Sequence, residues 1–576
     1  MNRQFAFNLA AAVAAAFATT AAAAATITVN STADAALDDG QCTLREAITS
    51  TSTNLASGVS SGECAAGEPL PAVDTIAFAI AGTGVHTIQP TSTLPSINEA
   101  VIIDGYTQSG AHPNTLAVGD DAALMVEIDG SLLGSGDLLH LPSAGSILRG
   151  LAINRVNGYS VFIGSSNPGD GNLIAGNFFN TDPTGTVLEG GHFTVLRVSG
   201  TNNIVGGTAP ADRNVFGGGG GSNAGTLAIT GSSNVVQGNY IGLDASGTVP
   251  LLPDGGVNGI ELSVATDTLI GGDEAGAGNV IVASQVAIRL SSGLARTTIQ
   301  GNLIGTDASS EIPLTPGAMG IRTDNGPADT LVGGLTSGAG NVFSGLGTGI
   351  YLIDGPTGFV IQGNRFGTDR SGTQSVPNRG SAIFLEMPGI NGSIIGGTDP
   401  GAANTIAYNC GYGVQFAFGP NHWPILGNSI HSNGGLGISF NGPSPSVNDA
   451  GDGDTGANDL QNYPVITSAV AAGGSVTVSG TLNSTPSTAF RLEFFASEFC
   501  DATGFGEGQQ FIGTTDVTTD ANGDASFGPL SFAAPDDAEI TATATDPAGN
   551  TSEFSQCAGP HDHLFASGFD VGGCGA

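Results

Sequence analysis

An acidic loop at residues 448–460, NDAGDGDTGANDL, has the residue types of a cation site. Hard cations such as Ca²⁺ bind several carboxylate and amide oxygens from one flexible loop. The stretch is not an EF-hand, because no helical pattern flanks it and its twelfth residue is not a glutamate. We expect either a calcium site, with calcium as the cofactor, or a solvated acidic linker between two domains. The side chains that would bind the ion are Asp449, Asp452, Asp454, Asn458 and Asp459.

A second set of acids recurs through the middle of the chain, one after each Gly-Asn phrase. Glycosidases need two carboxyl groups about 5 to 9.5 Å apart. If each repeat makes three coils of a solenoid, these acids stack roughly 14 Å apart, which is three strand spacings. We therefore interpret them as turn formers that bind their own backbone. They are Asp182, Asp244, Asp307 and Asp369.

Other signatures of chemistry are incomplete. The tripeptide NTD at 180–182 resembles a polygalacturonase motif, but the Gly-His-Gly and Arg-Ile-Lys pieces are absent. A polysaccharide lyase needs clustered acids and an arginine base, and Arg289, Arg322 and Arg365 are available without identifiable partners. Catalytic residues therefore stay unknown. His561 and His563 are too few ligands for a metal site, and a loose terminus is expected there.

The charge and the N-terminal residues restrict the partners and the compartment. Acidic residues outnumber basic ones by 50 to 13, giving a net charge of −37, and no lysine occurs. This charge repels nucleic acid and anionic lipid, so no nucleic acid is expected as a partner. Residues 1–25 are alanine-rich and end in small residues, which predicts a signal peptide. No other long apolar run occurs, so we expect no transmembrane span in the mature chain.

The six cysteines are an even number in a chain expected to be exported, which predicts disulfides. Their pairing does not follow from the sequence. Cys42 with Cys64 and Cys500 with Cys557 are the pairs that we expect first. The predicted location is secreted, extracellular or at the cell surface.

Two phrases repeat through the middle of the chain with a common period. The first, G-N-x-[IF], recurs at intervals of 62, 63, 62 and 64 residues. The second follows a Gly-Gly pair and has the form N-[VT]-[IF]. We expect the asparagines to stack in turns and to satisfy backbone groups along a solenoid. They are Asn177, Asn239, Asn302, Asn364 and Asn428 in the first phrase, and Asn214, Asn279, Asn341 and Asn404 in the second.

Between these phrases lie short runs rich in Ile, Val, Leu and Thr, each closed by Gly, Asn or Asp, which is typical of strands and turns. No run has the spacing of a stable helix. A period of about 63 residues divides into three coils of about 21 residues each, which suits a right-handed parallel β-helix. The predicted class is therefore all-β.

The sequence resembles the exported right-handed parallel β-helix repeat proteins that carry an N-terminal C-[ST]-L-R-E-A motif. The resemblance rests on CTLREAI (42–48), VIIDGYTQSGAHPNT (101–115), the repeated GN and GGT phrases and NDAGDGDTGANDLQNYPVI (448–466). It implies the architecture along nearly the whole mature chain. It implies no particular chemistry, because the family has no general activity.

The CTLREAI motif predicts a short helix at 43–50 that caps the open end of the solenoid, whose exposed strand edges would otherwise aggregate. Leu44, Ala47 and Ile48 would share its buried face, while Arg45 and Glu46 would point away. A disulfide from Cys42 would hold this cap in place.

Alternating polar and apolar residues in SVTVSGTL (475–482), FRLEFFA (490–496) and EITATATD (539–546) predict a C-terminal immunoglobulin-like β-sandwich. The expected organisation is a signal peptide (1–25), an N-terminal cap region (26–100), a β-helix (101–445), an acidic junction (446–462), a sandwich (463–557) and a tail (558–576). Within the tail, LFASGFD resembles endings of some exported bacterial proteins and suggests an attachment tag.

These features favour a structural, adhesive or glycan-binding β-solenoid, with polysaccharide or cell-surface components as partners. The alternative is a polysaccharide lyase or glycoside hydrolase that acts on one solenoid face. An enzyme should gather carboxylates and arginines within about 10 Å on one face, whereas a binding protein should show a shallow aromatic or polar stripe.

Overall fold

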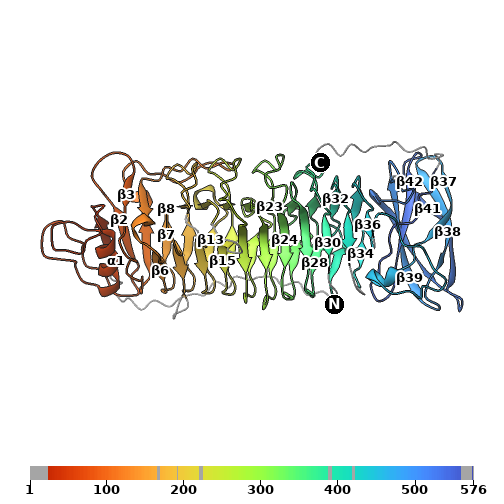
Figure 1. Ribbon diagram of the computed structural model, residues 1–576, viewed down its shortest axis with the longest axis horizontal. Helices are drawn as coiled ribbons and strands as arrows, with labels where there is room; N and C mark the ends of the chain where they lie inside the picture. Colours follow the sequence, from red (N-terminus) through yellow and green to blue (C-terminus); the bar gives the residue numbers. More distant parts are fainter. Residues whose placement is uncertain are drawn as a thin grey trace, which may run out of the picture.

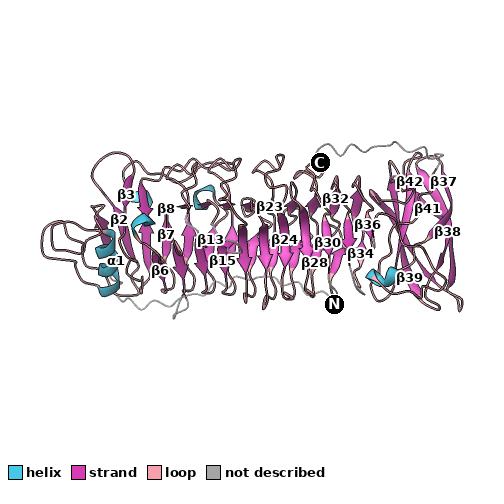
Figure 2. Cartoon of the chain, viewed as in Figure 1, coloured by secondary structure: helices cyan, strands magenta, loops and turns pink. Residues whose placement is uncertain are grey.

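The computed structural model shows an elongated molecule, with a β-solenoid in the middle, a helix at its N-terminal end and a small β region at the other end (Figure 1). Nearly all of its regular structure is strand (Figure 2). The predicted signal peptide and the tail with His561 and His563 lie almost wholly outside the described residues. The structure describes residues 24–559, except 165–168, 191–192, 220–224, 387–391, 418–421, 441 and 502, and it describes residue 574.

The solenoid consists of three long parallel sheets, which confirms the predicted parallel β-helix. The first sheet has 13 strands. In spatial order they are β1 (Thr26–Val29), β2 (Asp74–Phe78), β4 (Val101–Asp104), β7 (Ile147–Arg149), β10 (Leu173–Ala175), β13 (Ile204–Gly206), β16 (Val235–Gln237), β19 (Leu269–Gly271), β22 (Thr298–Gln300), β25 (Leu331–Gly333), β28 (Val360–Gln362), β31 (Ile394–Gly396) and β34 (Ile425–Leu426).

The second sheet has 12 strands and the third has 11. The second contains β3 (His86–Ile88), β5 (Val126–Asp129), β8 (Ala152–Asn154), β11 (Phe178–Phe179), β14 (Val215–Phe216), β17 (Tyr240–Ile241), β20 (Val280–Ile281), β23 (Leu303–Ile304), β26 (Val342–Phe343), β29 (Arg365–Phe366), β32 (Thr405–Ala407) and β35 (Ser429–His431). The third contains β6 (Leu139–Leu141), β9 (Val161–Ile163), β12 (Leu196–Val198), β15 (Gly225–Ile229), β18 (Asn258–Leu262), β21 (Val286–Leu290), β24 (Met319–Thr323), β27 (Thr348–Leu352), β30 (Ile383–Leu385), β33 (Val414–Phe416) and β36 (Ile438–Ser439).

Each 63-residue period makes two coils, so the expected three coils of about 21 residues were wrong. Val235 of the first sheet pairs with Ile204, which is 31 residues earlier. The coils are longer than assumed because each contains a long connection, such as residues 242–257 between β17 and β18 in one coil and residues 272–279 between β19 and β20 in the next. Residues one period apart are consequently two strand spacings apart, roughly 9.6 Å. The repeated aspartates still act in turns, since the Asp244 carboxylate accepts hydrogen bonds from the backbone N–H groups of Thr248 and Val249.

The interior of the solenoid is largely apolar, but rows of buried asparagines run along it. The longest of these rows joins the two repeated phrases. In this row the backbone N–H and side-chain amide of one asparagine both donate to the side-chain oxygen of the asparagine in the next coil. Asn279 donates in this way to Asn302 at 3.0 and 2.9 Å, and Asn302 donates to Asn341 at 3.0 and 2.9 Å. The row satisfies polar groups that would otherwise be buried without partners.

The N-terminal cap contains α1 (Leu44–Thr53) at the end of the solenoid (Figure 1). Thr43 caps the helix, and its side chain and that of Glu46 form a capping box. Leu44, Ala47 and Ile48 are buried as expected. Glu46 is buried too, contrary to the expectation, because the capping box draws its carboxylate onto the backbone N–H groups of Thr43 and Leu37.

The C-terminal region is a small antiparallel β-sandwich of two three-stranded sheets around a shared apolar core. Its immunoglobulin-like connectivity stays a prediction. One sheet contains β37 (Val465–Ala471), β38 (Ser475–Asn483) and β41 (Asp524–Ala533); the other contains β40 (Gln510–Thr518), β39 (Ala489–Ser497) and β42 (Glu539–Thr545). The remaining elements are the 3₁₀ turns η1 (Gly105–Thr107), η2 (Gly130–Leu132), η3 (Pro210–Asp212) and η4 (Ala457–Leu460). Among the described residues, no helix has the length and apolar character needed to cross a membrane.

Candidate functional site

One outward-facing row of side chains follows the third sheet along the solenoid. Its members occupy paired positions on successive parallel strands, one per coil, and all are partly exposed. We call this row the third-sheet stripe. In order it consists of His140, Phe162, Arg197, Ala228, Glu261, Arg289, Arg322, Tyr351, Phe384 and Gln415.

Aromatic groups occupy both ends of the third-sheet stripe. At the N-terminal end, Phe162 lies edge-on to His140 at 5.6 Å between ring centroids, and it contacts Tyr159. The Arg197 guanidinium lies 5.3 Å from the Phe162 ring centroid. At the other end, the rings of Tyr351 and Phe384 are 5.2 Å apart. Each end therefore offers an apolar ring surface beside polar groups.

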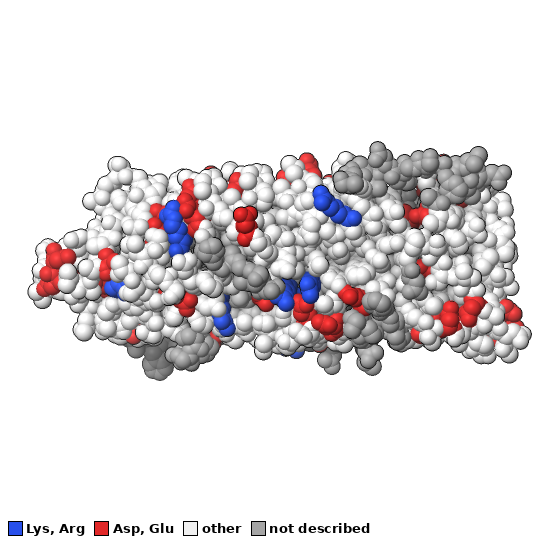
Figure 3. Space-filling view, viewed as in Figure 1, with Lys and Arg blue, Asp and Glu red and all other residues white. Residues whose placement is uncertain are grey.

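Charged residues gather in the middle of the stripe. The Nε of Arg289 lies 2.7 Å from the Asp324 carboxylate, and its Nη1 lies 3.9 Å from Glu261. Arg322 contacts the other oxygen of Asp324 at 3.0 Å. Asp324 follows the end of β24, two strands from Glu261 on β18 and two residues further along the strand direction, so their backbones are roughly 12 Å apart. On the face shown in Figure 3, charged side chains gather in a few separate groups on a mostly uncharged surface.

The electrostatics of this cluster differ from residue to residue. Burial raises the pKa of the Glu261 carboxyl above its usual value, and the charge of Arg289 only partly offsets this. The Nε of Arg322 is a buried donor without a hydrogen-bond partner in the described part of the chain. An unsatisfied buried donor is unfavourable.

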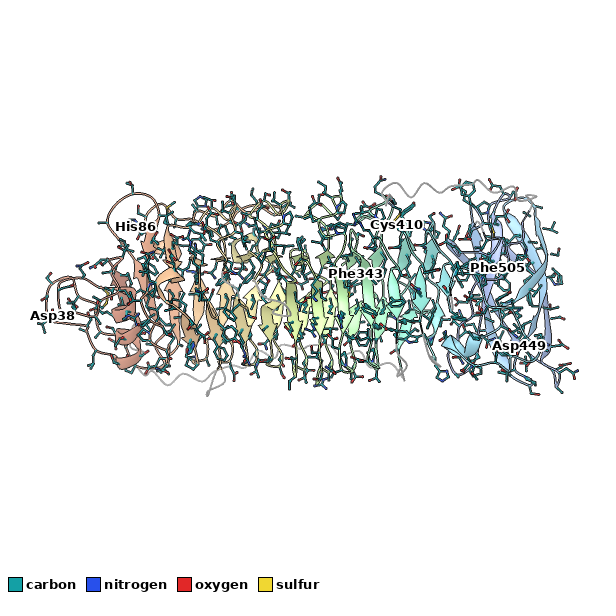
Figure 4. The ribbon with its side chains drawn as sticks, in the orientation of Figure 1. Asp38, His86, Phe343, Cys410, Asp449 and Phe505 are labelled. Atoms are coloured by element: carbon teal, nitrogen blue, oxygen red, sulfur yellow. A yellow bond between two sulfur atoms is a disulfide. The ribbon has the colours of Figure 1, made fainter. Side chains whose placement is uncertain are left out.

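The acidic loop lies beside the C-terminal sandwich, where Figure 4 labels Asp449. The structure brings together Asp449, Asp452 and Asp454, whose ligand atoms all lie within 4.8 Å of one another. Burial, with a smaller contribution from the two neighbouring carboxylates, raises the pKa of Asp452 to about 6. One oxygen of Asp449 is buried without a hydrogen-bond partner among the described residues. Oxygens so arranged fit a hard cation.

The other two predicted ligands have different contacts. The Asn458 side chain is buried and bonds to the backbone of Trp423 and Thr551, so it joins the last coil to the sandwich. Asp459 lies 3.9 Å from the His422 ring nitrogen and accepts a hydrogen bond from Asn550. Neither belongs to the three-carboxylate cluster.

Disulfide bonding is confirmed. The structure joins Cys42 to Cys64 and Cys500 to Cys557, the pairs expected first. It also joins Cys410, near the end of the solenoid (Figure 4), to Cys574. This third bond ties the chain terminus to a residue 164 positions earlier.

The sequence singled out Arg289 and Arg322, which the structure places side by side, and Arg365, which lies on the second sheet. It missed Glu261, Tyr351 and Phe384. A signal for them exists: in GIELSV, AIRLSS, GIRTDN, GIYLID and AIFLE, the residue after the isoleucine faces outward on the third sheet.

The strand pairing defines the chain as a parallel β-helix protein. No protein family and no curated protein sequence matches it. Among solved structures, it is similar to a tailspike protein of Escherichia coli bacteriophage HK620 in complex with a pentasaccharide (11% identity, 82% of this chain and 85% of that chain, TM-score 0.32). It is also similar to a tailspike protein, a capsular polysaccharide depolymerase, of Acinetobacter baumannii bacteriophage Fri1 (10% identity, 84% and 76% coverage, TM-score 0.26). At these identities and TM-scores the likeness concerns the β-helix fold alone.

Proposed function

We propose that the chain is an exported or cell-surface β-solenoid that binds a polysaccharide along the third-sheet stripe. The observation that carries this proposal is the row of partly exposed aromatic, basic, acidic and amide side chains on successive strands, interrupted by Ala228. From Phe162 to Phe384 the row crosses seven strand spacings, roughly 34 Å, which matches an extended polymer better than a small molecule. Such a protein can serve as an adhesive or structural component that holds a glycan.

The residue types suit a sugar chain. Aromatic rings provide flat apolar surfaces for the C–H faces of sugars, while the arginines, Glu261 and Gln415 can hydrogen-bond to hydroxyl groups. The rings at both ends would fix the chain, and the partly exposed Arg289 and Arg322 would hydrogen-bond to it near the middle. Because the stripe is shallow, we expect affinity to come from many weak contacts along the polymer.

Replacing Phe162 and Phe384 together by alanine should weaken glycan binding by ~10-fold or more, since each ring contact contributes about 0.5–1.5 kcal/mol beyond its buried area. The measurement is a glycan array followed by titration of the glycan that binds wild-type protein. Phe511→Ala is the matched control, because it removes a partly exposed ring from the sandwich. Equal binding by the double variant and the wild type would disprove the role of the stripe.

A second function, glycoside hydrolysis, is favoured by the Glu261–Arg289–Asp324 cluster. A protonated Glu261 could act as general acid, and Asp324, held by two arginines, could act as base. Arg289 contacts both carboxylates and so holds them on the same part of the stripe, where an inverting glycosidase needs two carboxyl groups about 6.5–9.5 Å apart. In the same titration, the wild type should release new reducing ends if it is a hydrolase. Loss of this release in Glu261→Gln and in Asp324→Asn would assign the hydrolysis to these two residues. If the glycan binds but no new reducing ends appear, glycan binding is the function of the stripe and hydrolysis is not.

The disulfides support the proposed location outside the cytoplasm. All six cysteines are paired, and such bonds persist in oxidising compartments and are rare in the cytosol. The acidic surface would keep an exported protein soluble and apart from nucleic acid.

We also propose Ca²⁺ as the ligand of Asp449, Asp452 and Asp454. Adding Ca²⁺ should raise the melting temperature and EDTA should lower it, because an ion bound only by the folded chain stabilises it by about 2.7 kcal/mol at a hundredfold excess over Kd. Asp454→Asn should abolish this response, whereas Asp537→Asn, an exposed acid in the sandwich, should preserve it. If Ca²⁺ leaves the melting temperature unchanged, the loop does not bind the ion.

A further inference from the structure

A separate groove of about 720 Å³ runs over the second sheet. Beneath it lie side chains on five neighbouring strands, paired in the order Tyr240, Val280, Leu303, Val342 and Arg365. The first four belong to a buried apolar cluster and are at most 6% exposed. Four strand spacings give the groove a length of roughly 19 Å. The groove therefore lies over a buried apolar layer along most of its length and has a basic end.

Two walls border the groove. One is the loop with Ala117 and Val118, and Val118 is 63% exposed. The other consists of turns with glycines, among them Gly276 and Gly338, whose backbone lies open to the groove. Such walls offer peptide N–H and C=O groups to the hydroxyl groups of a ligand.

The arginines that line the groove differ in what they contact. Arg213 clamps the loop wall, because its guanidinium donates to the backbone oxygens of Leu116 and Ala117 and lies 4.5 Å from the Tyr240 ring centroid. By contrast, the guanidinium groups of Arg365 and Arg370 have no hydrogen-bond or ion-pair partner in the described part of the chain; only their backbone N–H groups donate, to Asn341 and Ser310. Arg365 lies between Gly340 and Gly372, where added side chains would meet its guanidinium.

The two unpartnered arginines also break the repeat. At the position of Arg365, the preceding copies of the GN phrase have Phe178, Tyr240 and Leu303. At the position of Arg370, the same copies have Pro183, Ala245 and Ala308. The solenoid folds with apolar residues at both positions, so the fold does not require either arginine.

The charge of the groove is opposite to that of the protein. Its charged lining residues are Arg213, Arg365 and Arg370 against Asp273 and Glu274, whereas the whole chain has 13 bases against 50 acids. The Asp273 carboxylate accepts a hydrogen bond from Thr336 of the next copy. A ligand that is anionic at one end and neutral elsewhere suits this distribution, since the acids would repel a polyanion.

We propose that this groove is a second glycan site, which binds a short oligosaccharide bearing a carboxylate group at the end held by Arg365 and Arg370. The neutral sugars lie against the exposed loop wall at Val118 and bond to the glycine turns. The two guanidinium groups form charge-assisted hydrogen bonds with the carboxylate. The site lies on a different sheet from the third-sheet stripe and does not depend on it.

The test uses the full chain and two soluble probes, a xylo-oligosaccharide carrying one glucuronic acid and its neutral counterpart of the same length. Calorimetry should show that the wild type prefers the acidic probe by ~10-fold or more, and that salt weakens this preference. Arg365→Leu with Arg370→Ala restores the residues of the preceding copy and should remove the preference without lowering the melting temperature.

The matched control is Arg296→Ala with Arg379→Ala, which removes the same charge from exposed positions outside the groove and should keep the preference. Phe162→Ala with Phe384→Ala should keep it too, which separates this site from the stripe. Equal binding of the two probes by the wild type, or an unchanged preference in the Arg365/Arg370 variant, would overturn the proposal.

Discussion

Replacing Asn302 by alanine will destabilise the solenoid by about 3–5 kcal/mol, because it opens the asparagine row in the middle. The side-chain oxygen of Asn302 accepts hydrogen bonds from both the backbone N–H and the amide of Asn279. Its amide donates to the backbone oxygens of Ile270 and Gln300 and to Asn341. Asn302 is fully buried, so no water replaces these partners, and each orphaned group costs about 1–3 kcal/mol.

The measurement is the midpoint of unfolding in guanidinium chloride, followed by circular dichroism. Asn98→Ala is the control, since Asn98 is exposed and its amide bonds only to the nearby backbone oxygen of Ser96. A solenoid unfolds through neighbouring coils, so the lost contact should also appear as earlier exchange of amides in the adjacent coils. Equal midpoints for Asn302→Ala and Asn98→Ala would show that the row contributes little to stability.

The interior of the solenoid was predictable because the repeated phrases contain its contacts. Asparagines at a constant interval indicate one polar group per coil at the same turn, and the structure places them in one row. The repeats also indicate the number of coils in each period, but the predicted number, three, was wrong. The two asparagine phrases alternate along the row, Asn239 with Asn279 and then Asn302 with Asn341, so each period contributes two coils.

The candidate sites were less predictable, because their residues differ from copy to copy. Glu261, Arg289, Arg322 and Tyr351 occupy one structural position, but a search for repeats treats them as variation. Their proximity depends on strand register, which follows from pairing between coils. Glu46 was misplaced for a similar reason, since helical spacing alone does not reveal that a capping box buries its carboxylate.

The sandwich closes the solenoid with glutamates in place of further asparagines. A second row runs from Asn378 through Asn409 to Asn433 and ends at Glu507 of the sandwich. Both donors of Asn433, its backbone N–H and its amide, bond to one oxygen of Glu507 at 3.1 and 2.8 Å. Burial raises the pKa of Glu507 to about 8, although the hydrogen bonds from Asn433 oppose this. Protonated Glu507 therefore stabilises the junction, and ionisation of Glu507 destabilises it.

Stability should consequently fall as the pH rises. A carboxyl whose pKa is higher in the folded chain contributes stability that is fully present below the unfolded value of about 4.5 and is lost as the pH rises through about 8. Glu507→Gln keeps an oxygen for Asn433 and cannot ionise. Between pH 5 and 8 its unfolding midpoint in guanidinium chloride should therefore fall less than that of the wild type. The difference in the free energy of unfolding should be on the order of a few kcal/mol. Glu311→Gln, which changes an exposed acid, should follow the wild type. Burial also raises the pKa of Glu553 at the same junction, so some pH dependence should remain in this variant. If Glu507→Gln leaves the pH dependence of stability unchanged, Glu507 is ionised in the folded protein.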